Sequence, residues 1–212
     1  MNQKQPSKNQ IRRYPIYLDY LKRKQAEGVI YISSPQIADS LNLSEEQVRK
    51  DLNFVSRNFG KPKVGREIKL LIFDIEEFLG YRDSQRAVLV GAGHLGRALM
   101  AYEGFLHYGL DIVCAFDNDI NKIDCIFYNK SIYSINELEK KCLELNVHIG
   151  IIAVPQQYAQ DVCDKLVSAG VKGIWNFTSA ILKVSDDIIV LNENLASSLA
   201  VLSNKLKEKF YK

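Results

Sequence analysis

The stretch "VLVGAGHLGRAL" (Val88–Leu99) joins an apolar run to a run with helical spacing, and it places three glycines between them. Gly91, Gly93 and Gly96 have the GxGxxG spacing of a dinucleotide-binding turn. The first glycine of such a turn permits a tight bend, the second lets a pyrophosphate approach the backbone, and the third lets the helix pack closely on the strand. A glycine-rich turn that holds no ligand is the alternative. We therefore predict a strand–turn–helix unit that opens a Rossmann-like domain.

Apolar strands alternate with helical runs after this turn. We predict further strands in "DIVCAFDND", "HIGIIAVP", "VKGIWNFT" and "DDIIVLN", with helices over 94–107, 135–145 and 157–169. Short, fully apolar strands in this alternation are typical of a parallel sheet covered on both faces. The sequence thus predicts an α/β domain with a parallel sheet.

Asp117 ends the strand that follows the glycine turn, 26 residues after Gly91. A carboxylate at this point accepts hydrogen bonds from the ribose hydroxyls of adenosine and repels a 2′-phosphate, although the nearby Lys122 partly offsets that repulsion. The diphosphate would lie on the N-terminus of the next helix, where free N–H groups favour anions. We therefore predict NAD(H) in preference to NADP(H). His94 lies inside the turn, where it would contact phosphate or, alternatively, act on a proton.

The N-terminal part has a different pattern. A helix is predicted over 10–28, and "ISSPQIADSLNLSEEQVRKDLNFVSRNFG" (32–60) then predicts two short helices separated by a tight turn at 42–43. The first helix starts at Ser34 and Pro35, since proline is tolerated in a first turn. Ser44 caps the second helix, and Gln47 completes a capping box.

The second of these helices has a polar, basic outer face that fits a DNA major groove. Its side chains are of the types that match purine edges and phosphates, and a small three-helix domain with a basic surface is the alternative. "GKPKVGREIKLLIF" (60–73) follows and predicts a β-hairpin wing with a basic tip, or else a plain basic loop. The predicted DNA-binding residues are Ser34, Gln47, Arg49, Lys50, Asn53, Arg57, Lys61 and Lys63.

Charge and composition agree with a chain of two parts. Residues 1–84 carry 15 Lys and Arg against 11 Asp and Glu, whereas residues 85–212 carry 13 against 14. The excess of basic residues therefore lies in the part of the chain that is predicted to bind DNA. No apolar run reaches 18 residues and the N-terminus lacks a secretory pattern, which predicts a cytoplasmic protein without a membrane span. The four cysteines lack metal-type spacing, so we expect reduced, mostly buried thiols and no metal.

The chain ends with "NENLASSLAVLSNKLKEKF" (192–210), in which leucines recur at helical spacing. Its narrow apolar seam would pack on its own domain or on a partner chain. We therefore divide the chain at 1–83, 84–191 and 192–212. About 100 residues hold the nucleotide fold, and no further segment presents a substrate pocket. This length favours a protein in which the nucleotide acts as a signal over a small NAD-dependent oxidoreductase.

With these features the chain resembles the redox-sensing transcriptional repressors of the Rex family over nearly its whole length. The resemblance rests on "SSPQIADSLNLSEEQVRKDL", "GAGHLGRALMAYEGF", "FDND", "VPQQYAQDV" and "AGVKGIWNF". It implies a homodimer with a winged helix-turn-helix domain, a Rossmann-like NAD(H) domain and a C-terminal helix swapped between subunits. It further implies repression at a palindromic operator and release by NADH.

The resemblance also assigns residues to the cofactor. It implies that the turn holds the pyrophosphate, that Asp117 holds the ribose, and that Tyr102 takes part in switching. It places 153–155 beside the nicotinamide half and Leu195 near the partner's nicotinamide pocket. The cofactor-binding residues predicted in all are Gly91, Ala92, Gly93, His94, Leu95, Gly96, Asp117, Asn118, Lys122, Ala153, Val154, Pro155, Tyr102, Phe105 and Leu195.

Three departures from the family pattern concern the switch and the wing. Asp19 stands where the family commonly has Arg, Asn194 where it has Asp, and Arg66 where a Tyr is usual. The salt link that the resemblance implies between the first two positions cannot form with these residues. A constitutive dimeric DNA-binding regulator with a weakened or lost switch is therefore the alternative function.

Overall fold

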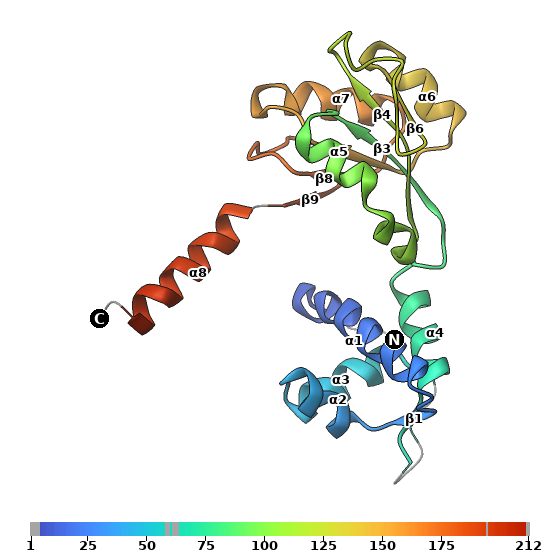
Figure 1. Cartoon of the computed structure of the whole chain (residues 1–212), viewed down its shortest axis with the longest axis vertical. Coiled ribbons are helices and arrows are strands. Elements are labelled where there is room, and N and C mark those ends of the chain that lie inside the picture. The colour runs from blue at the N-terminus through green and yellow to red at the C-terminus, as the bar shows by residue number, and fades with distance from the viewer. Residues whose placement is uncertain (1–4, 58–59, 61–63, 194, 211–212) are drawn as a thin grey trace. The chain divides into compact units, whose positions relative to one another are not determined.

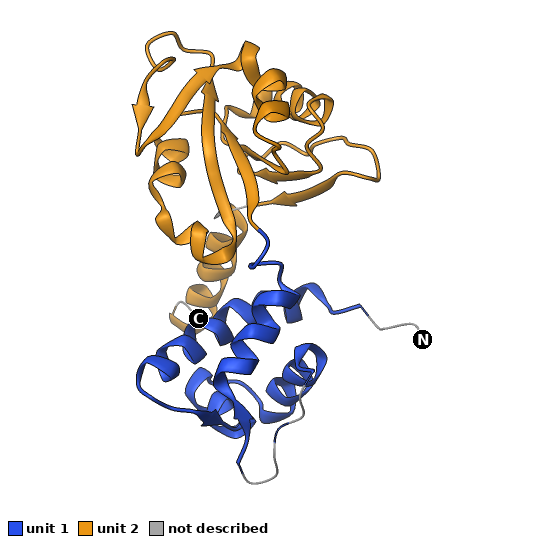
Figure 2. Cartoon of the chain, turned by 90° about the vertical axis from the view of Figure 1, so that its right-hand side faces the viewer, with its two compact units in different colours: residues 1–83 blue, residues 84–212 orange. Residues whose placement is uncertain are grey.

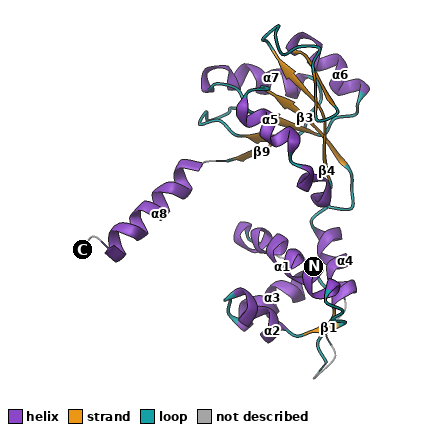
Figure 3. Ribbon diagram, viewed as in Figure 1, coloured by secondary structure: helices purple, strands orange, loops and turns teal. Residues whose placement is uncertain are grey.

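The computed structural model describes residues 5–57, 60, 64–193 and 195–210, and most of its helices and strands are labelled in Figure 1. The chain divides into two compact units, residues 1–83 (unit 1) and 84–212 (unit 2), which Figure 2 colours separately. Unit 1 is mostly helical, whereas unit 2 is built on a sheet (Figure 3). Among the described residues, no helix has the length and apolar character needed to cross a membrane.

Unit 1 forms a helical core around a helix-turn-helix. Tyr14, Leu18 and Leu21 of the first helix are buried, as are Val48 and Leu52 of the third. These residues recur at three- and four-residue steps, so one face of each helix meets the core. The elements are α1 (Lys8–Ala26), β1 (Tyr31–Ile32), α2 (Ser34–Leu41), α3 (Glu45–Val55), β2 (Arg66–Glu67) and α4 (Ile68–Phe78).

Capping residues define the helix-turn-helix. Helix α2 begins at Ser34 as predicted, and Ser33 forms the capping box with Gln36 that the sequence reading missed. Asn42 ends α2 in the left-handed region, with φ of 52°, a conformation that asparagine tolerates. Ser44 caps α3 by accepting from the backbone N–H of Gln47.

The predicted wing hairpin is wrong over residues 68–73, which form the start of α4. Ile68, Leu71 and Ile75 are buried at helical spacing, and this period prevails over a strand. The short strand β2 instead pairs antiparallel with the distant β1, with Arg66 opposite Ile32. Lys61 and Lys63 lie outside the described residues.

Unit 2 contains a seven-stranded sheet in the order β5-β6-β4-β3-β7-β8-β9, in which only the β5–β6 pair is antiparallel. Helices α6 and α7 pack on one face, over Val88 and Phe116, while α5 packs on the other, over Leu89. The elements are β3 (Gln85–Val90), α5 (His94–Ala101), β4 (Leu110–Asp117), β5 (Ile126–Phe127), β6 (Lys130–Ser134), α6 (Leu138–Glu144), β7 (Ile149–Ile152), α7 (Ala159–Ser168), β8 (Gly173–Asn176), β9 (Ile189–Asn192) and α8 (Leu195–Phe210), with 3₁₀ turns at Glu103–Tyr108, Ile135–Glu137 and Gln156–Tyr158.

Two features of unit 2 differ from the prediction. The β5–β6 hairpin was not predicted; its turn holds Tyr128 and Asn129 at φ of 47° and 60°, as a tight hairpin requires. The helix predicted over 94–107 breaks at Tyr102, whose extended backbone ends α5 and begins the 3₁₀ turn.

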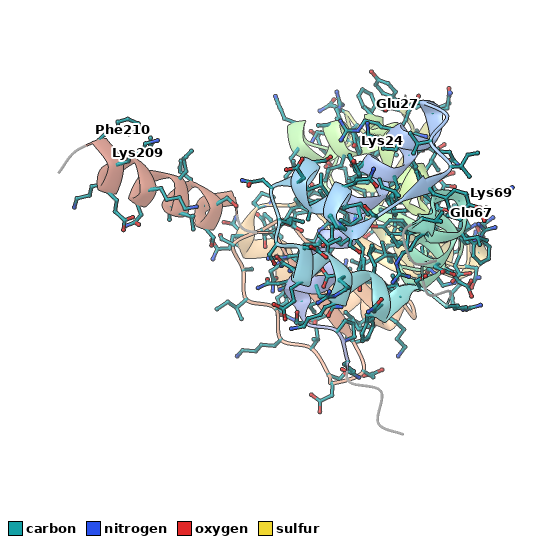
Figure 4. All side chains as sticks on the ribbon, turned by 90° about the horizontal axis from the view of Figure 1, so that it is seen from below. Lys24, Glu27, Glu67, Lys69, Lys209 and Phe210 are labelled. Atoms are coloured by element: carbon teal, nitrogen blue, oxygen red, sulfur yellow. The ribbon has the colours of Figure 1, made fainter. Side chains whose placement is uncertain are left out.

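Helix α8 carries the C-terminal apolar seam. Every described side chain from Ala196 to Phe210 is exposed, including the seam residues Leu199, Leu202 and Leu206. Lys209 and Phe210 mark its end in Figure 4. Apolar side chains left in water at this spacing indicate a face that a further surface covers.

The four thiols differ in exposure, because Cys125 is exposed while Cys114, Cys142 and Cys163 are buried. Burial raises the pKa of Cys114 to about 12 and that of Cys142 to about 11, so their reactive thiolate forms are scarce. We expect the exposed thiol of Cys125 to react with an aromatic disulfide reagent on the order of 100-fold faster than the three buried thiols at pH 8. Cys125→Ser should remove this fast phase; its persistence would contradict the assignment.

Candidate nucleotide and nucleic-acid sites

The three glycines of the turn meet different surroundings. Gly91 has φ of 102°, and a Cβ atom there would overlap the carbonyl oxygen of Ala153. A Cβ atom on Gly96 would overlap the carbonyl oxygen of Gly91, whereas one on Gly93 would meet nothing within 4 Å. The first and third glycines therefore serve the fold, while the second leaves space open beside the backbone.

Gly93 is also the N-cap residue of α5, and no side chain of the described residues caps this helix. The first-turn N–H groups of an uncapped helix N-terminus, together with the helix dipole, attract anions. The open space at Gly93 and this uncapped terminus therefore coincide. Together they suit a diphosphate.

Asp117, at the end of β4, ties the turn to its surroundings. Its side chain is 6% exposed, and Oδ2 accepts from the backbone N–H of Ala92 at 2.8 Å and from Nζ of Lys122 at 3.2 Å. Oδ1 accepts from the backbone N–H of Asp119 at 2.9 Å. These bonds hold a carboxylate next to the glycine turn, where an adenosine ribose would need an acceptor.

A cavity of about 450 Å³ lies beside this carboxylate. It lies where β3, β4 and β7 end, at the point where the strand order reverses, and ligands of open α/β sheets bind in this crevice. Eight of the predicted residues line it: Gly91, Gly93, Asp117, Asn118, Lys122, Ala153, Val154 and Pro155. The lining residues that the sequence reading missed are Val90, Ile135, Tyr158, Asp161, Val162 and Lys165.

Three of the six missed residues, Asp161, Val162 and Lys165, come from α7, which starts beyond 153–155. The apolar period that predicted this helix gave no sign of which residues face the strand ends. Val162 belongs to the core, while Asp161 and Lys165 are exposed charges on the same side of α7. They give the cavity a mixed apolar and charged wall, which suits a purine ring with polar edges.

Other predicted cofactor residues lie outside that cavity lining. Ala92 and Gly96 are buried in the turn, and His94 and Leu95 are exposed at the start of α5. The side chain of Leu195 lies outside the described residues.

Tyr102 and Phe105 belong instead to an aromatic row. Their ring centroids are 4.8 Å apart, and Phe105 lies 5.5 Å from Trp175, which lies 4.8 Å from Phe177. Tyr102 is 53% exposed, so one end of the row faces solvent. The row thus has an exposed tyrosine available for contacts beyond this chain's own core.

The outer face of α3 carries the predicted DNA contacts. Arg49, Lys50 and Asn53 are all exposed. Lys50 forms an exposed ion pair with Glu46 at 2.7 Å, and pairs of this kind are worth little in water. DNA phosphates can therefore compete for Lys50 at small cost.

Three further predicted DNA contacts, Gln47, Arg57 and Ser34, lie in other surroundings. Gln47 is half-buried, and its amide oxygen accepts from Nη1 of Arg13 at 2.9 Å when that oxygen faces the guanidinium. Arg57 lies beyond the end of α3 and pairs with Glu77 at 2.6 Å. Ser34 is half-buried as the first residue of α2. The contact with Arg13 therefore overrides the outward placement that helical spacing predicted for Gln47, whereas Arg57 remains exposed.

A buried polar network ties α3 to α1. Asp51 is 2% exposed and receives two bonds from Arg13, from Nε at 2.7 Å and from Nη2 at 2.9 Å. Tyr17 donates to Asp51 Oδ2 at 2.8 Å, and Tyr14 donates to its backbone oxygen at 3.0 Å. Burial raises the pKa of Tyr14 to about 12, so this phenol stays a donor. The network fixes α3 against α1.

Asp51→Ala should lower the free energy of unfolding of unit 1 by about 3 kcal/mol, because it leaves the Arg13 fork and Tyr17 without their buried acceptor. Urea unfolding followed by circular dichroism measures this change. Glu46→Ala removes an exposed carboxylate from the same helix and should cost at most about 0.5 kcal/mol. Equal effects of the two substitutions would contradict the role of the network.

Two family models match the chain. The model described as "CoA binding domain" matches residues 82–180, and the one described as "Putative DNA-binding protein N-terminus" matches residues 7–53. The first covers β3 to β8 with the glycine turn, and the second covers α1 to most of α3. The two matches agree with the two units.

Curated relatives align over nearly the full length. The redox-sensing transcriptional repressor Rex of Treponema denticola is 43% identical over 207 residues, which cover 98% of both chains. The Rex of Bacteroides fragilis is 39% identical, over 92% of this chain and 89% of that protein.

Solved structures agree with these relatives. A structure of RSP in complex with NAD+ and operator DNA has a TM-score of 0.91 at 31% identity, covering 97% of this chain and 94% of that one. RSP in complex with NADH has a TM-score of 0.85 at 32% identity, covering 97% and 96%.

Proposed function

The chain belongs to the Rex family of redox-sensing transcriptional repressors, and on this premise we propose that it binds operator DNA through unit 1 and NAD+ or NADH through unit 2. The family consists of regulators and not of enzymes. One observation carries the proposal: Gly93 leaves an open approach to the backbone beside the buried carboxylate of Asp117, in a chain that also holds a helix-turn-helix.

The cavity supports adenosine as the half of the cofactor that unit 2 encloses. Ile135 and Val162 supply apolar surface for a purine, and Asp117 supplies the ribose acceptor. The diphosphate would lie at Gly93 on the N-terminus of α5. Asp117 and Asp119 flank the single ammonium of Lys122, at 3.2 Å and 3.5 Å. This acidic balance disfavours a 2′-phosphate and supports NAD(H) over NADP(H).

Helix α3 is the proposed recognition helix, and Arg49, Lys50 and Asn53 are its proposed contacts with DNA. Recognition helices of this class enter the major groove and use side chains of these types on base edges and phosphates. The predicted contacts Lys61 and Lys63 would bind the adjacent backbone as part of the same proposal.

The assembly is proposed to be a homodimer in which α8 packs on the partner subunit. Leu199, Leu202 and Leu206 are 63%, 55% and 44% exposed, and a helix with such a seam gains stability by burying it. A dimer places its two recognition helices on the two half-sites of a palindromic operator.

Leu202→Asp should raise the dimer dissociation constant by about 100-fold or more, because it moves a charge into the apolar seam. Sedimentation velocity over a concentration series reads this shift directly. Asn204→Asp adds the same charge on the opposite side of the helix and should leave the dimer unchanged. A dimer that tolerates both substitutions would remove α8 from the interface.

NADH is proposed to release the protein from its operator in the cytoplasm. The RSP structure with operator DNA holds NAD+, which supports the oxidised form as the one compatible with DNA. A ligand shifts this equilibrium only by its different affinity for the two states. NADH must therefore favour the DNA-free state over the DNA-bound state more strongly than NAD+ does.

Calorimetric titration of the full-length chain with NADH and with NAD+ tests the nucleotide proposal. Binding of both coenzymes, lost in Asp117→Ala, is the expected result. Absence of heat and of any thermal stabilisation with either coenzyme would refute it, and a DNA-binding protein without a sensor would remain.

A further inference from the structure

The amide of Asn53, on the outer face of α3, is already oriented by a second residue. Nη2 of Arg66 in β2 donates a hydrogen bond to Oδ1 of Asn53. An amide has one acceptor oxygen and one NH2 group with two donors. Arg66 occupies one of the two lone pairs of this oxygen and fixes its direction, so the NH2 group is the end of the Asn53 amide that is turned away from Arg66.

Arg66 is held in place from several directions. Its backbone pairs with Ile32 in the short β1–β2 ladder. Its side-chain carbons cover Gly60, because a Cβ atom on that glycine would lie 3.1 Å from Cγ of Arg66. Burial lowers the pKa of Arg66, and the nearby carboxylate of Asp74 opposes this effect. Since guanidinium groups stay protonated in proteins, Arg66 is a permanent donor to Asn53.

This orientation changes what Asn53 can read in a major groove. A free asparagine recognises adenine with both of its polar atoms, accepting from N6 and donating to N7. An asparagine that turns its NH2 group to the base can still donate to N7 of adenine, but it faces the N6 amino group, itself a donor, without an acceptor. Guanine offers two acceptors, N7 and O6, and thymine offers O4.

We propose that Arg66 is a positioning residue that makes Asn53 favour bases with an acceptor oxygen on their major-groove edge, guanine or thymine, over adenine and cytosine, which present an amino group there. The inference rests on the proposed DNA-binding function of α3. It also gives a role to Arg66, which stands where the family usually has Tyr.

Selection of the full-length protein on a random duplex pool, followed by anisotropy titrations on single-base variants, tests the proposal. One position per half-site should require guanine or thymine, with adenine weakening binding about tenfold or more. Asn53→Ala should remove the preference at that position alone. If the base is guanine, 7-deazaguanine should also weaken binding by the wild type but not by Asn53→Ala.

Arg66→Met frees the amide oxygen while keeping a long side chain over Gly60. It should shift the preference at the same position towards adenine, and Arg66→Lys, which restores a donor, should recover guanine or thymine. Should Arg66→Met fail to fold by circular dichroism, Asn53→Asp at the exposed position serves instead, because an acceptor-only carboxylate should favour cytosine there.

An Asn53-dependent position that prefers adenine or cytosine in the wild type would overturn the proposal. So would an unchanged base profile in Asn53→Ala, or in a folded Arg66→Met variant. These outcomes differ from a failure of the proposed function, in which the wild type would select no sequence from the pool.

Discussion

Gly93→Val is expected to weaken binding of NAD+ and NADH by at least about 100-fold, because its side chain would fill the space that a pyrophosphate needs for close approach to the backbone. The substitution suits the local backbone, with φ of −76° and ψ of −164° at this position. No atom lies within 4 Å of the added Cβ. The less favourable N-cap should cost only about 1 kcal/mol of stability.

Calorimetry measures the loss of affinity, and thermal unfolding without ligand checks that the variant is folded. Gly96→Val is the matched comparison, since a side chain there would overlap the Gly91 carbonyl and should disrupt unit 2 itself. Unchanged coenzyme affinity in Gly93→Val would mean that the diphosphate does not lie at this turn.

Arg49→Ala should weaken operator binding by about 10- to 100-fold and, where the contact is to phosphate, reduce the salt dependence by about one unit of slope. Arg49 is exposed on α3, and among the described residues it forms no ion pair that would compete with DNA. Arg12→Ala removes the same charge from an exposed position on α1 and should have a much smaller effect. Equal losses of operator affinity in both variants would indicate that only net charge matters and that α3 is not the recognition helix.

The helix-turn-helix could be predicted because its signals are local. The Ser44 cap, the proline near the start of α2 and the apolar period each act within a few residues. The prediction of a wing hairpin was wrong for the opposite reason. Strand β2 is two residues long and pairs with β1, which lies more than thirty residues away in the sequence. Helical spacing continued through 68–75 and decided the structure there.

The nucleotide site divides in the same way. The glycine turn, Asp117 and the segment 153–155 lie at strand ends and could be predicted from the strand pattern. Asp161 and Lys165 reach the cavity from the side of α7, which only the crossing of helix and sheet determines. The orientation of Gln47 towards Arg13, like that of Asn53 towards Arg66, depends on contacts between distant segments.

The central claim is that the oxidation state of the coenzyme bound in unit 2 changes the affinity of unit 1 for DNA. Operator binding by the full-length protein, titrated at saturating NADH and at saturating NAD+, measures this coupling directly. We expect at least tenfold weaker binding with NADH, a coupling of about 1.4 kcal/mol. Equal operator affinity with the two coenzymes would contradict the claim and leave a constitutive DNA-binding regulator.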